Sequence, residues 1–71
     1  MNLTQLRVFC EIMKSGSISK TANTLGRTQP AVSLAVKNLE QTLGFKLFER
    51  QGRQLVPVPE AAYLFLSLIH I

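Results

Sequence analysis

Apolar residues recur at helical spacing in several separate stretches of the chain. In the first stretch the expected inward positions are Leu3, Leu6, Phe9, Cys10 and Met13. Spacings of three and four residues place them on one face of a helix. Asn2 suits the N-cap of this helix, and Gly16 suits a left-handed stop at its end. The pattern therefore predicts a first helix between these two residues.

A second, shorter helix is predicted between Ser17 and Gly26. Ser17 can accept hydrogen bonds from the backbone N–H groups of the first turn, and glycine commonly adopts the left-handed conformation that ends a helix. Within the segment, Ile18, Ala22 and Leu25 share one face.

A tight turn leads from Gly26 into a third helix, expected over residues 29–43. Thr28 is a good N-cap, and Pro30 lies in the first turn, where no backbone donor is needed. An apolar stripe spaced by four, three and four residues consists of Val32, Val36, Leu39 and Leu43. This stripe is expected to pack inward, which leaves the polar opposite face at the surface.

The pattern changes from helical to alternating after Gly44. Phe45–Glu49 is too short for an amphipathic helix and predicts a strand, with Phe45 and Leu47 on the side opposite Phe48. A turn is expected at Gln51, Gly52 and Arg53. Gln54–Val56 then returns beside the first strand until Pro57 ends the ladder. Leu47 and Phe48 are expected to close the core over Leu39 and Leu43.

A fourth helix is expected from Pro59, whose fixed backbone angle suits a first turn, as does the charge of Glu60. Its shared apolar face consists of Ala61, Leu64, Phe65 and Leu68. The order of two helices, a tight turn, a helix, a wing and a further helix predicts a fold class. That class is mainly α with a small β wing, a winged helix-turn-helix with a three-helix core.

Length and charge narrow the function. The chain has 71 residues, 46% of them apolar, which suits one small domain. Eight Lys and Arg against four Asp and Glu give a formal charge of +4, which favours a polyanionic partner. A helix with a polar N-terminal end fits the DNA major groove. The same spacing also describes a plain helical bundle with a structural or protein-binding role.

The sequence gives little indication of nucleophilic catalysis, metal binding or a membrane span. A lone Cys10 in an apolar stripe, with no base beside it, is expected to have a raised pKa and to be no nucleophile. His70 has no second ligand at metal-binding spacing. No apolar stretch reaches the roughly 18 residues of a membrane span. We expect a cytoplasmic protein that is not an enzyme and holds no cofactor or metal.

Several motifs together resemble a known family. They are Leu6–Phe9, Gly16–Ile18, Ala22, Leu25, Thr28–Ser33, Leu39–Glu40, Leu43–Gly44 and Leu47–Arg50. At these intervals they are similar to the N-terminal signature of LysR-type transcriptional regulators, over the whole chain up to Pro59. The resemblance implies that residues 1–58 form a winged helix-turn-helix domain that binds double-stranded DNA sequence-specifically.

The resemblance also implies partners beyond this domain. Residues 59–71 are expected to begin a longer linker helix, truncated at Ile71, through which full-length relatives form homo-oligomers. The apolar face expected to meet a second copy is Leu64, Phe65, Leu68 and Ile69. The effector-binding domain of the family is absent from this chain, so a small-molecule effector would act only through that domain. The family usually has Thr and Gly where this chain has Val58 and Ala61.

The family's DNA contacts can be carried over residue by residue. The helix from about 29 to 43 would read the major groove, and the wing near Arg53 would touch the backbone or the minor groove. The implied DNA-binding residues are Thr28, Gln29, Pro30, Ser33, Leu34, Lys37 and Arg53. Gln and Ser can bond base edges, whereas Thr and Lys suit phosphates. Leu34 stands where relatives commonly carry a polar or basic residue, and we expect it to meet a thymine methyl group.

Two questions stay open at this level. The basic residues Arg7, Lys14 and Lys20 either solvate helix surfaces or touch phosphates, and Arg50 can instead pair with Glu49 or with a core carbonyl. The alternative function is a winged-helix protein-interaction module, in which Leu34 and the apolar tail would form the contact patch.

Overall fold

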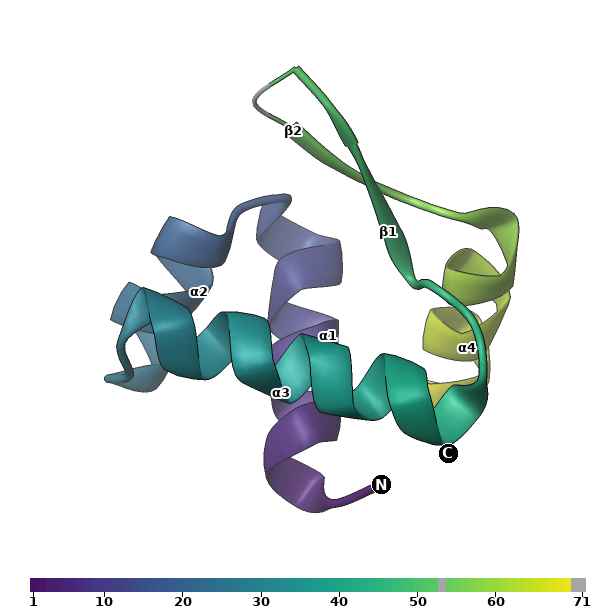
Figure 1. The fold of residues 1–71 in the computed structure, drawn as a ribbon, viewed down its shortest axis with the longest axis horizontal. Helices are drawn as coiled ribbons and strands as arrows, with labels where there is room; N and C mark the ends of the chain where they lie inside the picture. The colour runs from purple at the N-terminus through teal and green to yellow at the C-terminus, as the bar shows by residue number, and fades with distance from the viewer. Residues whose placement is uncertain (53, 70–71) are drawn as a thin grey trace.

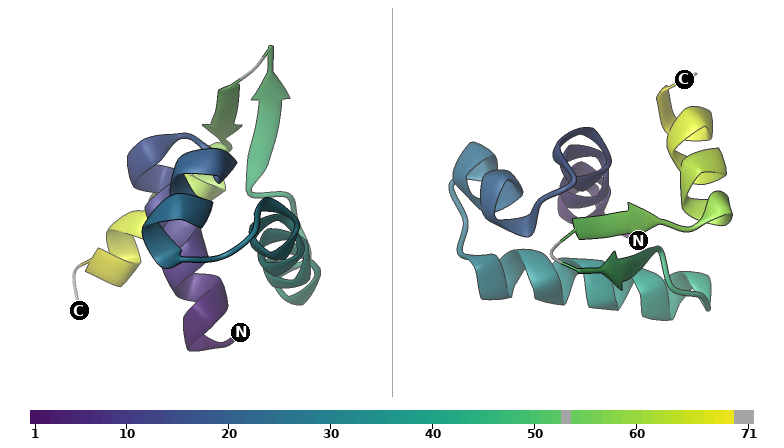
Figure 2. Two further views of the ribbon diagram at one scale, coloured as in Figure 1. Left: turned by 90° about the vertical axis from the view of Figure 1, so that its left-hand side faces the viewer. Right: turned by 90° about the horizontal axis from the view of Figure 1, so that it is seen from above.

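The computed structural model describes residues 1–52 and 54–69. In order, its elements are α1 (Leu3–Ser15), α2 (Ile18–Leu25), α3 (Gln29–Leu43), β1 (Phe48–Gln51), β2 (Gln54–Pro57) and α4 (Pro59–Ile69). The first three helices pack around one core, with α3 crossing α1 (Figure 1). The antiparallel hairpin of β1 and β2 stands over α3 as a wing, and α4 lies beyond the C-terminal end of α3 (Figure 2). The predicted winged helix-turn-helix is confirmed.

Side-chain caps fix where the helices begin. The Ser17 hydroxyl accepts a hydrogen bond from the backbone N–H of Lys20 at 3.1 Å, and the Thr28 hydroxyl accepts one from the N–H of Ala31 at 3.2 Å. Each bond satisfies a donor that has no partner within its own helix. The caps predicted at Ser17 and Thr28, and the one at Asn2, are confirmed.

The core lies where α1, α2 and α3 meet the base of the wing. Its largest fully buried apolar side chains are Phe9, Ile12, Leu39, Leu47, Val8 and Val32. The ring centroid of Phe9 lies 6.0 Å from that of Phe48 in β1 and 6.4 Å from that of Phe65 in α4. Phe9 therefore joins the wing and the fourth helix to the helical core. The inward stripe predicted for α3 is confirmed.

The buried face of α1 differs from the predicted one. Leu3, predicted to face inward, is 71% exposed, whereas Val8 and Ile12 are buried and were not predicted. Phe9 is buried as expected. The reason is that α1 packs against α2, α3 and α4, so its covered face is wider than one stripe of residues.

The first strand also differs from its prediction, because it begins at Phe48 and not at Phe45. The backbone N–H of Leu47 donates to the Glu40 carboxylate at 2.7 Å, and its carbonyl accepts from the N–H of Val58 at 2.9 Å. Leu47 is thus held to α3 by Glu40 and across the base of the hairpin by Val58. Leu47 and Phe48 are both buried, so the predicted alternation is wrong, although their place in the core is confirmed.

The helix α4 begins at Pro59 as predicted, but the apolar residues that it exposes differ from the predicted ones. Ala61 is buried and Leu64, Phe65 and Leu68 are packed half-buried against the core. Most of the apolar face that was expected to meet a second copy is therefore partly covered by the core. The exposed apolar residues of α4 are Tyr63, Leu66 and Ile69. Within residues 1–52 and 54–69, no helix is both long and apolar enough to cross a membrane.

Candidate nucleic-acid interface

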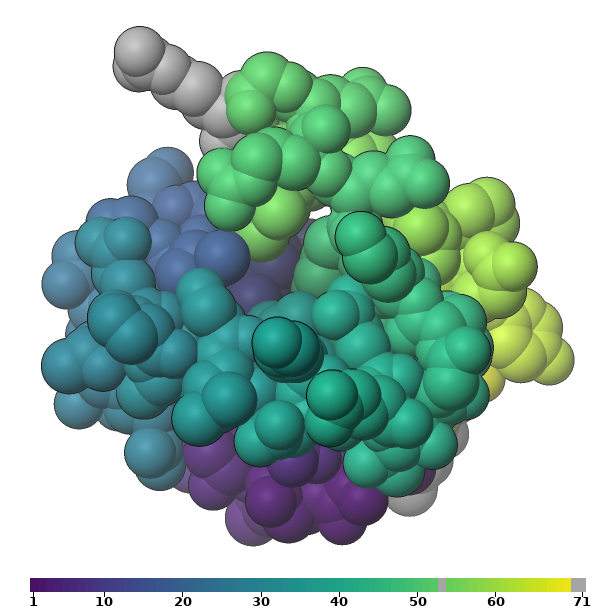
Figure 3. All heavy atoms as spheres, in the orientation of Figure 1, coloured from purple at the N-terminus to yellow at the C-terminus, as the bar shows by residue number. Residues whose placement is uncertain are grey.

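A groove separates α3 from the wing. Figure 3 shows the hairpin in green above α3 in teal, with the surface hollowed between them. The residues that line this groove are Gly16, Ser17, Ile18, Ser19, Gln29, Ser33, Arg50 and Leu55. They come from the α1–α2 turn, the first turn of α2, the N-terminal half of α3 and both strands of the wing. We call this surface the α3–wing groove.

The predicted recognition residues fall on and beside this groove. Gln29 and Ser33 lie one helical turn apart on α3 and line the same wall. Pro30, Leu34 and Lys37 are exposed and follow one another at helical spacing on the outward face of α3. The side chain of Leu34 is 57% exposed. Arg53, predicted as the wing contact, lies outside the described residues.

Thr28 is exposed at the N-terminal end of α3. Its hydroxyl oxygen accepts the capping bond from Ala31. A hydroxyl group that accepts in this way still has its own proton to donate. Thr28 can therefore cap the helix and bind an anion at the same time.

Arg50 belongs to the groove, and sequence reasoning missed it. In the observed register Arg50 is paired across the hairpin with Leu55, and both residues line the groove. Arg50 lies two residues from the buried Phe48, on the same side of β1. The alternation of the strand carried the signal, because Arg50 follows Phe48 by two residues and Phe48 was expected in the core. No ion pair of Arg50 with Glu49 is present among the described residues.

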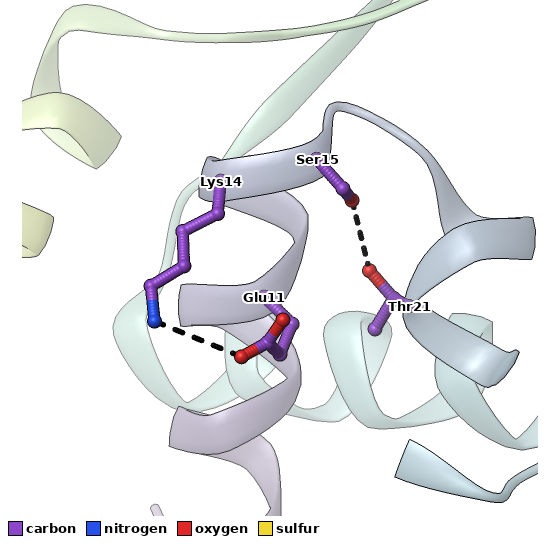
Figure 4. A network of polar contacts seen from close by, with 4 residues as sticks. All are labelled: Glu11, Lys14, Ser15 and Thr21. Atoms are coloured by element: carbon purple, nitrogen blue, oxygen red, sulfur yellow. Dashed lines mark hydrogen bonds and ion pairs between the residues drawn. The ribbon is translucent and has the colours of Figure 1, made fainter. Parts of the chain in front are cut away.

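A hydrogen-bond network fixes the α1–α2 turn that forms one wall of the groove. The Ser15 hydroxyl lies 3.3 Å from the hydroxyl of the fully buried Thr21 and accepts from the N–H of Ser17 at 3.2 Å. Figure 4 shows the contact between Ser15 and Thr21. It also shows the ion pair of Lys14 with Glu11, at 3.7 Å along α1. The wall is therefore anchored to α2 by a partly buried polar contact.

The Cys10 thiol is poorly suited to act as a nucleophile. Burial raises the pKa of the Cys10 thiol, and the nearby Lys14 opposes that shift. A raised pKa keeps the thiol protonated and weakly nucleophilic at neutral pH. Among residues 1–52 and 54–69, no group of three His, Cys, Asp or Glu side chains is placed to hold a metal ion. His70, expected not to bind a metal, lies outside the described residues.

Comparisons with known proteins agree with this arrangement. The sequence model described as "Bacterial regulatory helix-turn-helix protein, lysR family" matches residues 3–62. The transcriptional regulator AdmX of Serratia plymuthica is 46% identical over 65 residues, which cover 92% of this chain and 21% of AdmX. The chain thus spans about a fifth of the length of this relative.

Solved structures agree at the level of the fold and the family. The BenM_DBD/catB site 1 DNA complex superposes with a TM-score of 0.92 at 34% identity, covering 99% of this chain and 79% of that chain. A LysR-family regulator from Eggerthella lenta superposes with a TM-score of 0.91 at 28% identity, covering 97% of this chain and 99% of that chain. The chain therefore belongs to the LysR family of bacterial regulatory helix-turn-helix proteins, as a winged helix-turn-helix DNA-binding domain.

Proposed function

We propose that α3 reads base edges in the major groove of duplex DNA while the wing lies along the neighbouring backbone or minor groove. The observation that carries this proposal is the α3–wing groove, which gathers Gln29, Ser33 and Arg50 at the N-terminal end of α3. A helix that docks in the major groove touches bases through its first turns. A relative of this fold is seen in complex with DNA, the BenM_DBD/catB site 1 DNA complex.

Each residue has a distinct proposed role. Gln29 pairs bidentately with adenine and Ser33 bonds a base edge, whereas Thr28 and Lys37 hold phosphates. Pro30 lets the first turn approach the DNA without an unsatisfied backbone donor. Leu34 packs against a thymine methyl group, and the wing reaches the DNA through Arg50 and Arg53.

We also propose that this domain is one part of a longer regulator. Residues 1–58 bind DNA, and residues 59–71 begin the linker helix through which two copies form a homo-oligomer. An effector-binding domain outside this chain would supply regulation, in the cytoplasm and without catalysis. Supporting this, the curated relatives are transcriptional regulators several times longer than the chain.

The salt dependence of binding to a random duplex tests the proposal. Counterion release predicts that the affinity falls steeply as salt rises, with a log–log slope of about −0.9 per neutralised phosphate. Selection from random duplexes should then yield a preferred site that binds more tightly than the random duplex. A flat salt dependence with no preferred site would instead favour the protein-interaction module.

The methyl contact of Leu34 has its own test. Thymine is replaced by uracil at each position of the selected site, which removes only the methyl group. At one position the wild type should lose affinity, and Leu34→Ser should be insensitive there. If no position behaves in this way, Leu34 is an ordinary exposed leucine.

A further inference from the structure

A second hollow lies outside the α3–wing groove. It is lined by Thr4, Arg7, Leu25 and Arg27, none of which lines the α3–wing groove. Thr4 and Arg7 come from the first turns of α1, whereas Arg27 lies in the turn that leads into α3. We call this surface the arginine hollow. It is lined by two arginines that are 20 residues apart in the sequence.

Within the part of the chain that the structure describes, the two arginines of the arginine hollow are not paired with an acidic side chain. Arg7 and Arg27 are both exposed, and no acidic side chain lines the hollow. Glu11, one turn after Arg7 on α1, pairs with Lys14 at 3.7 Å. Among the described residues no ion pair involves either arginine. The hydroxyl of Thr4 likewise has no hydrogen-bond partner within residues 1–52 and 54–69, so it can donate to a ligand.

Two guanidinium groups and a hydroxyl select a particular ligand chemistry. Guanidinium groups bind phosphate oxygens bidentately and remain charged at any physiological pH. The ligand class is therefore a phosphate oxyanion, either in a nucleic-acid backbone or free in solution. The choice between these two sources depends on where the hollow lies.

The arginine hollow lies on the opposite side of α3 from the wing. The first turns of α1 lie below α3 and the wing stands above it in Figure 1, and the view from the side in Figure 2 agrees. Arg27 directly precedes Thr28, the N-cap of α3. A helix in the major groove has one sugar–phosphate backbone on each side. The wing side would meet one backbone, and the arginine hollow would meet the other.

We propose that Arg7 and Arg27 form a phosphate-binding site for the DNA backbone that faces away from the wing. The site rests on the proposed function, because it needs α3 in the major groove. It is distinct from the base-reading groove, since it contributes affinity for any sequence. It also assigns to Arg7 a role in DNA binding in place of simple solvation of α1.

The test compares Arg7→Gln, Arg27→Gln and the double variant with wild type in the 71-residue chain. Each lost phosphate contact should lower the magnitude of the salt slope by about 0.9, so the double variant should lose about 1.8. Between 50 and 200 mM salt, wild type should then lose about 12-fold more affinity than the double variant. The preferred sequence should stay the same. Circular dichroism checks that the variants fold.

Lys14→Gln is the matched control, because Lys14 is an exposed cation on α1 that pairs with Glu11 and does not line the hollow. Its slope should equal that of wild type. An unchanged slope in the double variant would overturn the proposal. Wild type that fails to bind duplex DNA at all would instead overturn the proposed function, so the two failures are distinguishable.

A second measurement separates the two sources of phosphate. Inorganic phosphate is titrated against chloride at constant ionic strength while the side-chain N–H signals of Arg7 and Arg27 are followed by NMR. Shifts at both arginines together with a reduced slope in the double variant support the backbone site. Shifts at both with an unchanged slope would assign the hollow to a free oxyanion and overturn the backbone proposal.

Discussion

The helices α3 and α4 are both amphipathic, yet their outward faces are opposite in character. Besides Pro30, Ala31 and Leu34, the exposed residues of α3 are polar, among them Ser33, Lys37 and Gln41. In contrast, α4 exposes Tyr63, Leu66 and Ile69, which are 76%, 54% and 58% exposed. A polar face beside a groove suits DNA, whereas an apolar face in water suits another protein surface. The domain therefore exposes a mainly polar surface on α3 and an apolar surface on α4.

The two helices also differ in how they are held. Thr28 and Gly44 cap α3 at both ends, and its inward stripe crosses the centre of the core. The helix α4 is attached through the buried Ala61 and the partly buried Phe65, whose ring meets Phe9. An isolated helix of its length is marginal in water, so α4 depends on these contacts.

The largest expected effect is on stability and comes from Phe9, which packs against both the wing and α4. Phe9→Ala should lower the free energy of unfolding by about 3–5 kcal/mol, because a buried ring between Phe48 and Phe65 is lost. Denaturant titration measures the change. Leu3→Ala, at an exposed position of the same helix, should change it by less than about 0.5 kcal/mol. Equal effects at both positions would contradict the assigned core.

The base-reading role of α3 should give the next largest effect. Gln29→Ala or Ser33→Ala should weaken binding to the preferred site by roughly 1–3 kcal/mol and relax the base preference at one position. Gln41→Ala is the matched control, because it removes the same amide from the C-terminal half of α3 and should have little effect. Binding to duplexes with single base changes measures the preference. A preference unchanged in both groove variants would refute the recognition role.

Lys37 should behave differently from Gln29 and Ser33. As a proposed phosphate contact, Lys37→Ala should weaken all sequences alike and reduce the salt slope by about 0.9. Binding to the preferred and a random duplex across a salt series measures both quantities. An altered base preference with the original slope would move Lys37 into the base-reading set.

The apolar surface of α4 predicts weak self-association. The chain should be a monomer in dilute solution and pair through α4 when concentrated, and Tyr63→Glu with Leu66→Glu should abolish pairing without unfolding. Sedimentation across a concentration series measures it. Phe65→Glu, by contrast, should destabilise the fold, because its side chain packs against the core. A dimer that survives the Tyr63 and Leu66 changes must use another surface.

The smallest expected effect concerns the reactivity of the Cys10 thiol, which lies on α1 near α4. Cys10 and Leu68 line the same groove between α1 and α4, and burial raises the Cys10 pKa above its ordinary 9.0. Alkylation should therefore be slow at neutral pH and should rise with pH up to the raised pKa, because its rate follows the fraction of thiolate. The folded thiol binds its proton more tightly than the unfolded one, so stability should fall as pH rises through this window. Phe65→Ala should speed alkylation if α4 shields Cys10.

Local chemistry in the sequence determined where the helices begin and which face of α3 points inward. Caps at Ser17 and Thr28 and a stripe from Val32 to Leu43 act within one or two turns, so short-range patterns carry them. The same reasoning predicted that Gln29 and Ser33 lie on the accessible side of α3. The motifs along the chain also sufficed to indicate the LysR family, which the comparisons then confirmed.

Only the tertiary structure decided the features that depend on distant partners. The start of β1 was set by the bonds of Leu47 to Glu40 and Val58, and the place of Arg50 beside α3 by the packing of the hairpin. The exposed face of α4 was set by packing against α1, and the arginine hollow by the approach of Arg27 to α1. The spacing of apolar residues shows which of them share one face of their own helix or strand. It does not show which other helix or strand covers that face. These surfaces could therefore be described only from the tertiary structure.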